Sequence, residues 1–262
     1  MSARFALLRS SVESALAGRV PAPFTYRDRR SVETVSTGAP EIDLLTGGLP
    51  RGGLTEICGP PCSGRTSLLV SALASRTADA ESCALVDGRD SFDPHAAETA
   101  GVRLKNLLWV RCKNIDQTMR ATDLLLQSGG FGMVAVDLAD LPPKNVRYVP
   151  LNAWFRFRRA VENTPTILLL LEQESNAKTC ASLVLRTVAR ETHWTAACEI
   201  APGEVLRHPV SRLLDRFSAR AEVLRSRIPR AEVVPFSRDF TAADKSGRAA
   251  NFELEAKWGP NL

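Results

Sequence analysis

The amino-acid sequence predicts an α/β fold: a mostly parallel sheet with helices on both faces and antiparallel strands toward the C-terminus. In the first part of the 262 residues, short apolar runs typical of buried strands alternate with helical segments. A glycine-rich loop joins one of these strands to a helix. The expected strands are Leu54–Cys58, Cys83–Asp87, Leu107–Val110, Met133–Asp137 and Thr166–Leu171, with helices at Thr66–Ser75, His95–Ala100, Ile115–Ser128 and Leu151–Glu162.

The C-terminal part of the chain predicts a different arrangement. Ala181–Val188 and Ala221–Arg227 show the alternation of strands, Val210–Phe217 is interpreted as a helix, and Phe252–Trp258 predicts a last strand. We divide the chain into an N-terminal helix (1–19), a linker (20–34), the α/β core (35–235) and a C-terminal tail (236–262). Apolar anchors in the polar tail predict a partly mobile partner-docking segment, and the alternative is simple packing of a last strand. These anchors are Phe236, Phe240, Phe252 and Trp258.

The glycine-rich loop has the spacing of a phosphate-binding loop. In such a loop, backbone N–H groups surround the phosphates, a lysine reaches the terminal phosphates, and a hydroxyl, here that of Thr66, holds magnesium. The loop lies between an expected strand and a helix, so the helix N-terminus faces the phosphates. Its residues are Gly59, Pro60, Pro61, Cys62, Ser63, Gly64, Arg65 and Thr66, followed by Ser67.

The lysine of this loop is replaced by Arg65. Arginine keeps the positive charge, but its planar guanidinium is bulkier than an ammonium and does not act as a compact point charge. The loop therefore predicts a nucleotide-binding fold and argues against ordinary nucleotide hydrolysis.

Composition and charge limit the function classes. The longest aliphatic run, Ile167–Leu171, is far too short to span a bilayer, so we expect a cytoplasmic protein without a membrane partner. The net charge of +5 favours a nucleic-acid or acidic partner, and a basic surface with no partner is the alternative. The six cysteines lack metal-ligand spacing and are expected to be reduced, mostly structural thiols.

Four segments, read in order, resemble the RecA-type recombinase core. They are Ser36–Gly52 before the loop, Val86–Pro94, Val134–Asp137 and Leu171–Gln173. The resemblance implies a RecA-like P-loop ATPase core that binds ATP with Mg²⁺. It also implies that Thr66 and Asp137 hold the metal, that Asp93 lies at the base, and that Gln173 senses the γ-phosphate.

Two further positions depart from this family. Arg89 stands where the family has the glutamate that activates water, and a guanidinium accepts no proton at neutral pH. Ala96 stands where a tyrosine stacks on adenine, which removes a π-face and predicts weaker adenine selectivity. We expect weak ATP binding at most, with little or no hydrolysis. A functional ATPase with a relocated base is the alternative.

Basic and aromatic residues predict an interface or a DNA contact. Arg147, Tyr148, Arg156 and Arg159 lie where aromatics alternate with arginines, as in surfaces that stack bases. The alternative is an amphipathic helix with Trp154, Phe157 and Val161 in the core, which we favour for Trp154 and Phe157. Arg225 and Arg227 align with a basic pair that crosses the subunit boundary in RecA filaments. An exposed basic strand face is their alternative.

The family's two DNA-binding loops are short here, at 142–150 and 174–180, which argues against strand exchange. Among RecA-like proteins the chain most resembles the ImuA subfamily. That resemblance implies an accessory protein of DNA-damage-induced (SOS) translesion synthesis, with an ImuB-like polymerase adaptor as partner. RecA, weak non-specific DNA contact and self-association are further expectations. The alternatives are an active DNA-stimulated ATPase or recombination mediator, and a regulator that caps RecA filaments.

Overall fold

The computed structural model describes residues 14, 32–196, 212–228 and 248–255. The chain divides into two units, 1–32 and 33–262, and every element below belongs to the second. The expected N-terminal helix and most of the expected linker and tail lie outside the described residues. The fold and the candidate site are therefore built from 33–196 and the two C-terminal strand segments.

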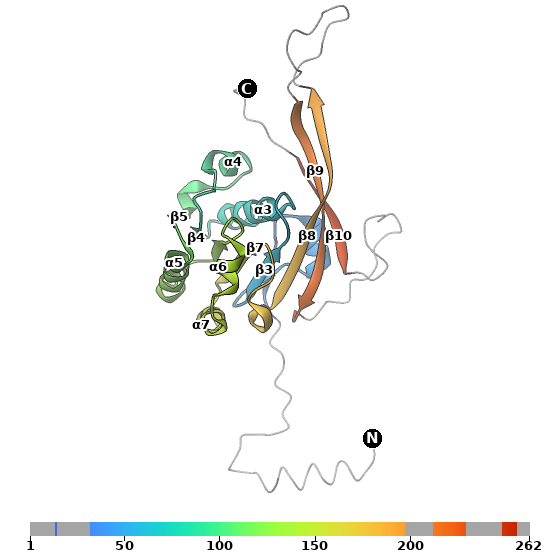
Figure 1. Cartoon of the computed structure of the whole chain (residues 1–262). Coiled ribbons are helices and arrows are strands. Elements are labelled where there is room, and N and C mark those ends of the chain that lie inside the picture. Colours follow the sequence, from blue (N-terminus) through green and yellow to red (C-terminus); the bar gives the residue numbers. More distant parts are fainter. Residues whose placement is uncertain (1–13, 15–31, 197–211, 229–247, 256–262) are drawn as a thin grey trace, which may run out of the picture. The chain divides into compact units, whose positions relative to one another are not determined.

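The main sheet has eight strands in the order β10-β9-β8-β3-β7-β6-β4-β5 (Figure 1). The strands β5, β4, β6, β7, β3 and β8 are parallel, and β9 and β10 add antiparallel strands at one end. The mostly parallel sheet with antiparallel C-terminal strands is thus confirmed. The bounds are β3 Leu54–Cys58, β4 Cys83–Asp87, β5 Leu107–Arg111, β6 Met133–Asp137, β7 Ile167–Glu172, β8 Leu183–Ala196, β9 Arg212–Ser226 and β10 Ala249–Glu255. Thr34–Val35 (β1) and Leu49–Pro50 (β2) form a separate two-stranded sheet.

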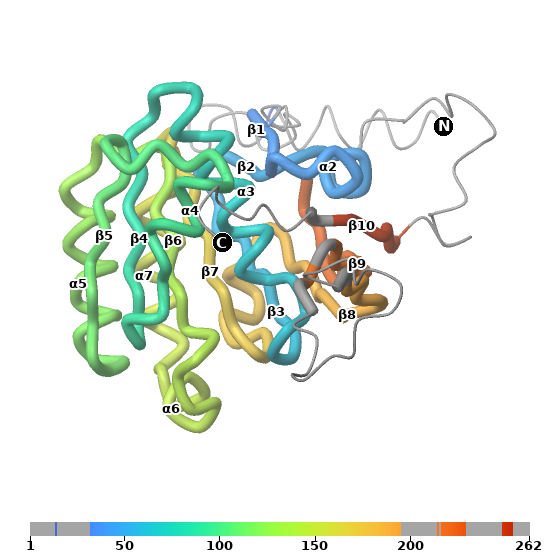
Figure 2. The backbone as a smooth tube through the Cα atoms, turned by 90° about the horizontal axis from the view of Figure 1, so that it is seen from above, coloured from blue at the N-terminus to red at the C-terminus, as the bar shows by residue number. Residues whose placement is uncertain are grey.

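Helices cover both faces of the main sheet, as expected from the alternation (Figure 2). In one core cluster, every second residue of the strands packs against α2, α3 and α4. In the other, the intervening strand residues pack against α5, α6 and α7. The strand interiors are apolar on both sides because both faces are buried. The bounds are α2 Pro40–Thr46, α3 Arg65–Ala78, α4 Pro94–Thr99, α5 Ile115–Ser128, α6 Pro143–Arg147 and α7 Leu151–Val161, with 3₁₀ turns η1 at Leu104–Asn106 and η2 at Lys178–Cys180.

The C-terminal part corrects one sequence prediction. The expected helix Val210–Phe217 is wrong, because β9 begins at Arg212 and pairs antiparallel with β8. Ala219 and Ala221, two residues apart, are fully buried, so the period of the strand and its pairing determine the structure here. The strand β8 also runs further than expected, to Ala196, with register shifts at Ala189/Glu191 and His193/Trp194. Phe252 of the tail is 1% exposed and packs in the core as part of β10.

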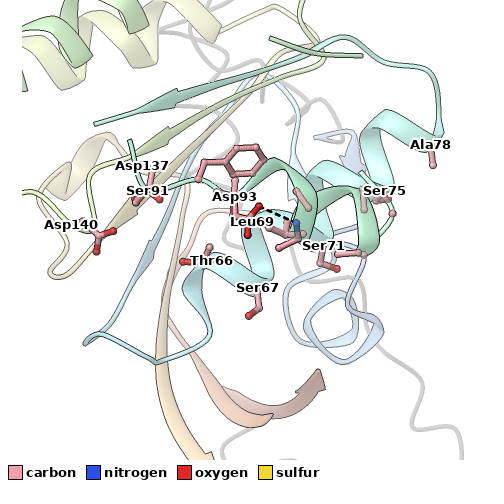
Figure 3. A pocket seen from close by; sticks show the side chains of 18 of the residues that line it. Thr66, Ser67, Leu69, Ser71, Ser75, Ala78, Ser91, Asp93, Asp137 and Asp140 are labelled. Carbon is pink, nitrogen blue, oxygen red and sulfur yellow. Dashed lines mark hydrogen bonds between the residues drawn. The ribbon is translucent and has the colours of Figure 1, made fainter. Parts of the chain in front are cut away.

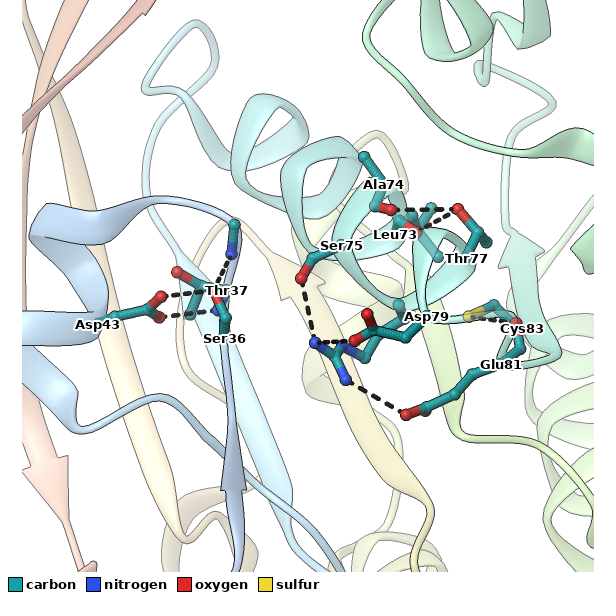
Figure 4. Close-up of polar contacts among 12 residues, drawn as sticks. Ser36, Thr37, Asp43, Leu73, Ala74, Ser75, Thr77, Asp79, Glu81 and Cys83 are labelled. Carbon is teal, nitrogen blue, oxygen red and sulfur yellow. Dashed lines mark hydrogen bonds and ion pairs between the residues drawn. The ribbon is translucent and has the colours of Figure 1, made fainter.

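Polar contacts fix the segment before the phosphate loop next to α3. The Asp43 carboxylate accepts hydrogen bonds from the Ser36 hydroxyl (2.6 Å) and the Thr37 N–H (2.7 Å), as Figure 4 shows. Gly38 has a φ of +79° and no room for a side chain, because a Cβ atom there would lie 2.5 Å from Ser71 of α3. This close approach brings the turn against the middle of α3 and to the edge of the candidate site.

Candidate nucleotide-binding site

The candidate site lies where adjacent parallel strands end. Cys58 of β3 pairs with Glu172 of β7, and Asp137 of β6 pairs with Asp87 of β4. The carboxyl ends of parallel strands meet at one edge of a sheet, and this edge is where open α/β sheets bind ligands. The glycine-rich loop, Asp137 and Gln173 therefore converge on the same edge.

The glycine-rich loop is held from the side of the antiparallel strands. The Ser63 hydroxyl lies 2.9 Å from the hydroxyl of Thr187 on β8, and both side chains are buried. Gly64 has a φ of +88°, and a Cβ atom there would lie 3.0 Å from the Phe217 ring and 3.1 Å from the Phe252 ring. Glycine is required at this position for two reasons, its left-handed backbone and the contact with the aromatic rings. Pro60, Pro61 and Cys62 form the exposed tip of the loop.

Arg65, the residue in the lysine position, is directed to the end of β7. Its side chain is buried, and its Nη1 donates a 2.7 Å hydrogen bond to the Glu172 backbone carbonyl. Burial lowers the pKa of Arg65, and the nearby carboxylates of Asp137 and Asp140 oppose this shift. The guanidinium thus serves as an internal cation near two acids.

A cavity of about 1020 Å³ lies between α3 and α4, large enough for a nucleotide. Thr66, Ser67, Asp93, Asp137 and Asp140 line it, and Figure 3 shows these side chains around one space. The structure therefore brings together four residues predicted from the sequence, and Asp140 joins them. Arg65, Gln173 and the loop from Gly59 to Gly64 do not line this cavity.

The acidic end of the cavity suits a hard cation. The Thr66 hydroxyl and the carboxylates of Asp137 and Asp140 are oxygen ligands of the kind that Mg²⁺ prefers. Burial raises the pKa of Asp137 to about 6, with further raising by Asp140 and Asp87, while the Ala139 N–H (2.9 Å) and Arg65 lower it. A bound cation would favour the ionised carboxylate, so these residues fit the metal that the resemblance implies.

At the opposite end of the cavity, position 96 supplies no base-stacking ring, although the ring of Phe92, packed edge-on against Trp109, is part of the lining. Asp93 caps α4, because its Oδ1 accepts the N–H groups of His95 (2.9 Å) and Ala96 (3.2 Å). Ala96 is exposed and contributes only a methyl group. Arg89 is exposed on the loop before α4, and the buried carboxylate of Asp87 shapes that loop by accepting the N–H groups of Arg89 (3.1 Å) and Phe92 (2.9 Å).

Gln173 contacts the protein itself. Its Nε2 donates a 2.8 Å hydrogen bond to the Ala139 carbonyl, beside a small cavity that is distinct from the main one. Two buried carboxylates lie near Gln173. Glu172 directly precedes it at the end of β7, and Glu56 lies on the neighbouring strand β3. The sequence analysis missed both. The available signal was a glutamate inside or at the end of an otherwise apolar strand, where a charge requires a specific partner.

The predicted interface arginines are mostly occupied by contacts within the chain. Arg147 pairs with Glu174 (2.5 Å), and Arg156 pairs with Asp123 (2.9 Å). Arg225 donates to the Lys178 carbonyl, and Arg227 donates to the Thr179 carbonyl at 2.6 Å. Within the described part of the chain, Arg159 is exposed with no such contact, and Tyr148 is 84% exposed.

The helix interpretation of α7 is confirmed for its inner face. Trp154, Phe157 and Val161 are buried on α7 and belong to the core. Leu151 and Phe155, four residues apart, are exposed on the outer face of the same helix. Together with Tyr148, these side chains place three exposed apolar or aromatic groups at 148, 151 and 155.

Among residues 32–196, 212–228 and 248–255, no group of three or more His, Cys, Asp or Glu side chains could hold a metal ion. The five described cysteines are free, and Cys62 is the exposed one. None of the described helices has the length and apolar character needed to cross a membrane.

These features define an α/β protein whose glycine-rich loop has phosphate-loop spacing and lies at the carboxyl edge of a mostly parallel sheet. Residues 22–147 match the model of the RecA N-terminal domain family. Proteins named Protein RecA from Acinetobacter baumannii strains AYE and SDF are 37% identical to this chain over 118 residues. The match covers 44% of this chain and 34% of each relative, so the chain spans about a third of the length of the curated relatives it matches. Over this part, the chain is similar in sequence to these RecA proteins.

Proposed function

We propose that this protein is a RecA-like accessory protein of DNA-damage-induced translesion synthesis, similar to ImuA, that binds protein partners with little or no ATP hydrolysis. The observation that carries the proposal is the direction of Arg65. Its guanidinium donates to the Glu172 carbonyl beneath the loop, so the cation that would reach a terminal phosphate is used within the fold. At the position of the water-activating base, Arg89 accepts no proton.

The retained half of the site supports nucleotide binding as a structural signal. Thr66, Asp137 and Asp140 offer oxygen ligands for Mg²⁺, and the cavity has room for a nucleotide. The metal would supply charge neutralisation at the phosphates, and the chain's own residues would position them. Weak ATP binding without turnover is therefore part of the proposal.

The outer face of α6 and α7 is the proposed partner surface. We name it the Tyr148 surface: Tyr148, Leu151 and Phe155, which are 84%, 39% and 45% exposed. Arg147 and Arg156 beside it are already paired with Glu174 and Asp123. Nucleic-acid binding depends on cations that are free to neutralise phosphates, and of the three arginines at 147, 156 and 159 only Arg159 is exposed without such a contact in the described part of the chain. Apolar anchors with a mostly paired rim suit a protein partner. We propose an ImuB-like adaptor as that partner, with RecA as the second candidate.

Steady-state ATP hydrolysis, with and without single-stranded DNA, tests the first part of the proposal. We expect no DNA-stimulated turnover from the full chain, and titration calorimetry with Mg²⁺ should show weak ATP binding. Robust DNA-stimulated turnover that Arg65→Ala abolishes would overturn the proposal. It would favour the active ATPase, for which the retained oxygen ligands Thr66 and Asp137 are the specific support.

Binding of the full chain to a purified ImuB-like adaptor tests the partner surface. The double variant Tyr148→Ser/Phe155→Ser should weaken binding at least tenfold, because both side chains are apolar anchors. Leu44→Ser is the matched control, since Leu44 is 54% exposed on α2, which covers the other face of the sheet. Equal binding by the double variant and the control would exclude this surface, and salt-dependent DNA binding lost only in the double variant would assign it to DNA instead.

A further inference from the structure

Two carboxylates lie inside the sheet behind the phosphate loop. Glu56 is in the middle of β3 and is 0% exposed, and Glu172 ends the neighbouring strand β7 and is 1% exposed. Because β3 and β7 pair in parallel with Cys58 opposite Glu172, the two glutamates lie two residues apart in register on the same face of the sheet. Two neighbouring negative charges in such an apolar place are strongly unfavourable.

Both carboxylates hold the same short segment. Glu56 accepts hydrogen bonds from the Ser175 hydroxyl (2.7 Å) and from the backbone N–H groups of Asn176 (2.9 Å) and Ala177 (2.7 Å). Glu172 accepts the Asn176 side-chain amide at 2.6 Å and its backbone N–H at 3.1 Å. All five contacts come from 175–177, which begins two residues after Gln173.

Glu172 also connects this segment to the phosphate loop. Its backbone carbonyl accepts the Arg65 guanidinium (2.7 Å) and the Gly59 N–H (3.3 Å), while its carboxylate holds Asn176. Glu172 thus links the phosphate loop on one side to the segment 175–177 on the other.

One atom of the pair shows how the charge is accommodated. In the described part of the chain, Glu172 Oε1 is buried without a hydrogen-bond partner. Burial and then the neighbouring Glu56 raise the pKa of Glu172 to about 8, against the lowering effect of Asn176. A retained proton leaves the pair with a single negative charge, which the donors of 175–177 satisfy.

Other ionisable groups lie around the pair. Burial raises the pKa of the Cys58 thiol to about 11 and also raises that of Cys180. Glu174, whose carbonyl accepts the Asn176 side-chain amide, is exposed and pairs with Arg147. The arginines near the two thiols stay charged throughout. They are Arg65 on α3, Arg158 on α7, Arg186 on β8 and Arg227 after β9.

We propose that Glu56 and Glu172 form a proton-controlled latch on 175–177, closed while Glu172 carries a proton and opened when that proton is lost. Closure holds the segment that follows Gln173 against β3 and β7. Opening releases this segment, so that Glu172, whose backbone carbonyl accepts the Arg65 guanidinium, loses its contacts with Asn176. The latch makes the geometry beside the nucleotide site depend on proton concentration near neutral pH, independently of any proposed partner.

Hydrogen–deuterium exchange on the full chain tests the latch. Exchange of peptides covering 173–180 is followed by mass spectrometry at several pH values and corrected for the intrinsic rate at each pH. Protection should fall about tenfold between pH 7 and pH 9, because the folded pair then loses a proton that it held more tightly than the open form. Protection that stays constant over this range in the wild-type chain would overturn the proposal.

Two variants separate the latch from other titrations. Glu172→Gln keeps the volume of the side chain and removes the titrating group, so protection of 173–180 should no longer depend on pH. Glu174→Gln, at an exposed neighbouring glutamate, is the matched control and should behave as the wild type. A pH dependence that persists in Glu172→Gln would contradict the latch.

Infrared difference spectra of the wild-type chain provide a measurement that needs no variant. A protonated carboxyl band present at pH 7 should disappear by pH 9. Its absence at pH 7 would overturn the proposal.

Discussion

The phosphate loop has different surroundings on its two sides. On the side of β6 and β7, the side chains expected to face the phosphates contact the protein itself: Arg65 donates to the Glu172 carbonyl, and Gln173 donates to the Ala139 carbonyl. On the side of β8, β9 and β10, the loop is packed closely, with Ser63 on Thr187 and Gly64 against two aromatic rings. The comparison teaches that the loop is maintained as a structural element even where its catalytic residues are replaced.

The largest test of this comparison removes the packing on the antiparallel side. Phe252→Ala should destabilise the protein by about 3–5 kcal/mol, because Phe252 is 1% exposed and touches Gly64 of the loop. Chemical denaturation measures the free energy of unfolding. Leu44→Ala, at an exposed position, is the control and should change it by less than about 0.5 kcal/mol. An equally small effect of Phe252→Ala would mean that β10 does not support the loop.

A smaller test removes only the hydroxyl that anchors the loop. Thr187→Val keeps the shape of the side chain but leaves the buried Ser63 hydroxyl without its partner, at a cost of about 1–3 kcal/mol. The same denaturation experiment on Thr192→Val, an exposed threonine further along β8, should show little change. If both variants unfold at the same denaturant concentration, the Ser63–Thr187 contact contributes nothing to stability.

On the β7 side of the loop, the test is how the free energy of unfolding depends on pH through Glu172. The pKa of Glu172 rises on folding from 4.5 to about 8, so its stabilising contribution is complete below the unfolded value and is lost as pH rises through 8. Between pH 7 and 9 the loss is on the order of 1 kcal/mol, and Glu172→Gln should remove it.

The buried cysteines also make stability depend on pH, so the unfolding free energy of the wild type is compared with that of Glu172→Gln at each pH. Burial raises the pKa of Cys58 to about 11 and that of Cys83 to about 12, so they also favour the folded state less as the pH rises above the unfolded thiol value. The difference between the wild type and Glu172→Gln cancels this shared contribution. A difference that stays flat from pH 7 to 9 would contradict the assignment to Glu172.

The smallest expected effect concerns the exposed edge of the β7 side. Arg147→Ala removes an ion pair whose side chains are 61% and 58% exposed, and such pairs contribute little in water. The midpoint of thermal unfolding should therefore stay unchanged within error. A clear decrease would show that Arg147 fixes 174–177 more firmly than an exposed pair can.

The parallel strands of the sheet could be predicted from the sequence. Runs such as Cys83–Asp87 and Met133–Asp137 are buried on both faces, so hydrophobicity alone marks them with their observed bounds. Thr66, Asp93 and Asp137 line one cavity because the loops that carry them follow parallel strands that end at the same edge of the sheet.

The remaining features depend on pairing between distant segments, which local patterns do not contain. Leu213, Leu214 and Phe217 suggested a helix, yet their segment pairs with β8 as a strand. The buried contacts of Glu56 with 175–177 join residues 119–121 positions apart. The direction of Arg65 depends on a backbone carbonyl 107 residues away, so its identity could be read from the sequence but its role could not.

The register shifts of β8 have a consequence for how the molecule meets its neighbours. β3 covers β8 only from Leu183 to Arg186 within the described sheet, which leaves the outer half of β8 as an edge. A regular edge of that length would accept a strand from another chain, and a bulge interrupts the repeat of donors and acceptors that such pairing needs. Because of the irregularities at Ala189/Glu191 and His193/Trp194, we expect this edge to be a poor template for a strand from another chain.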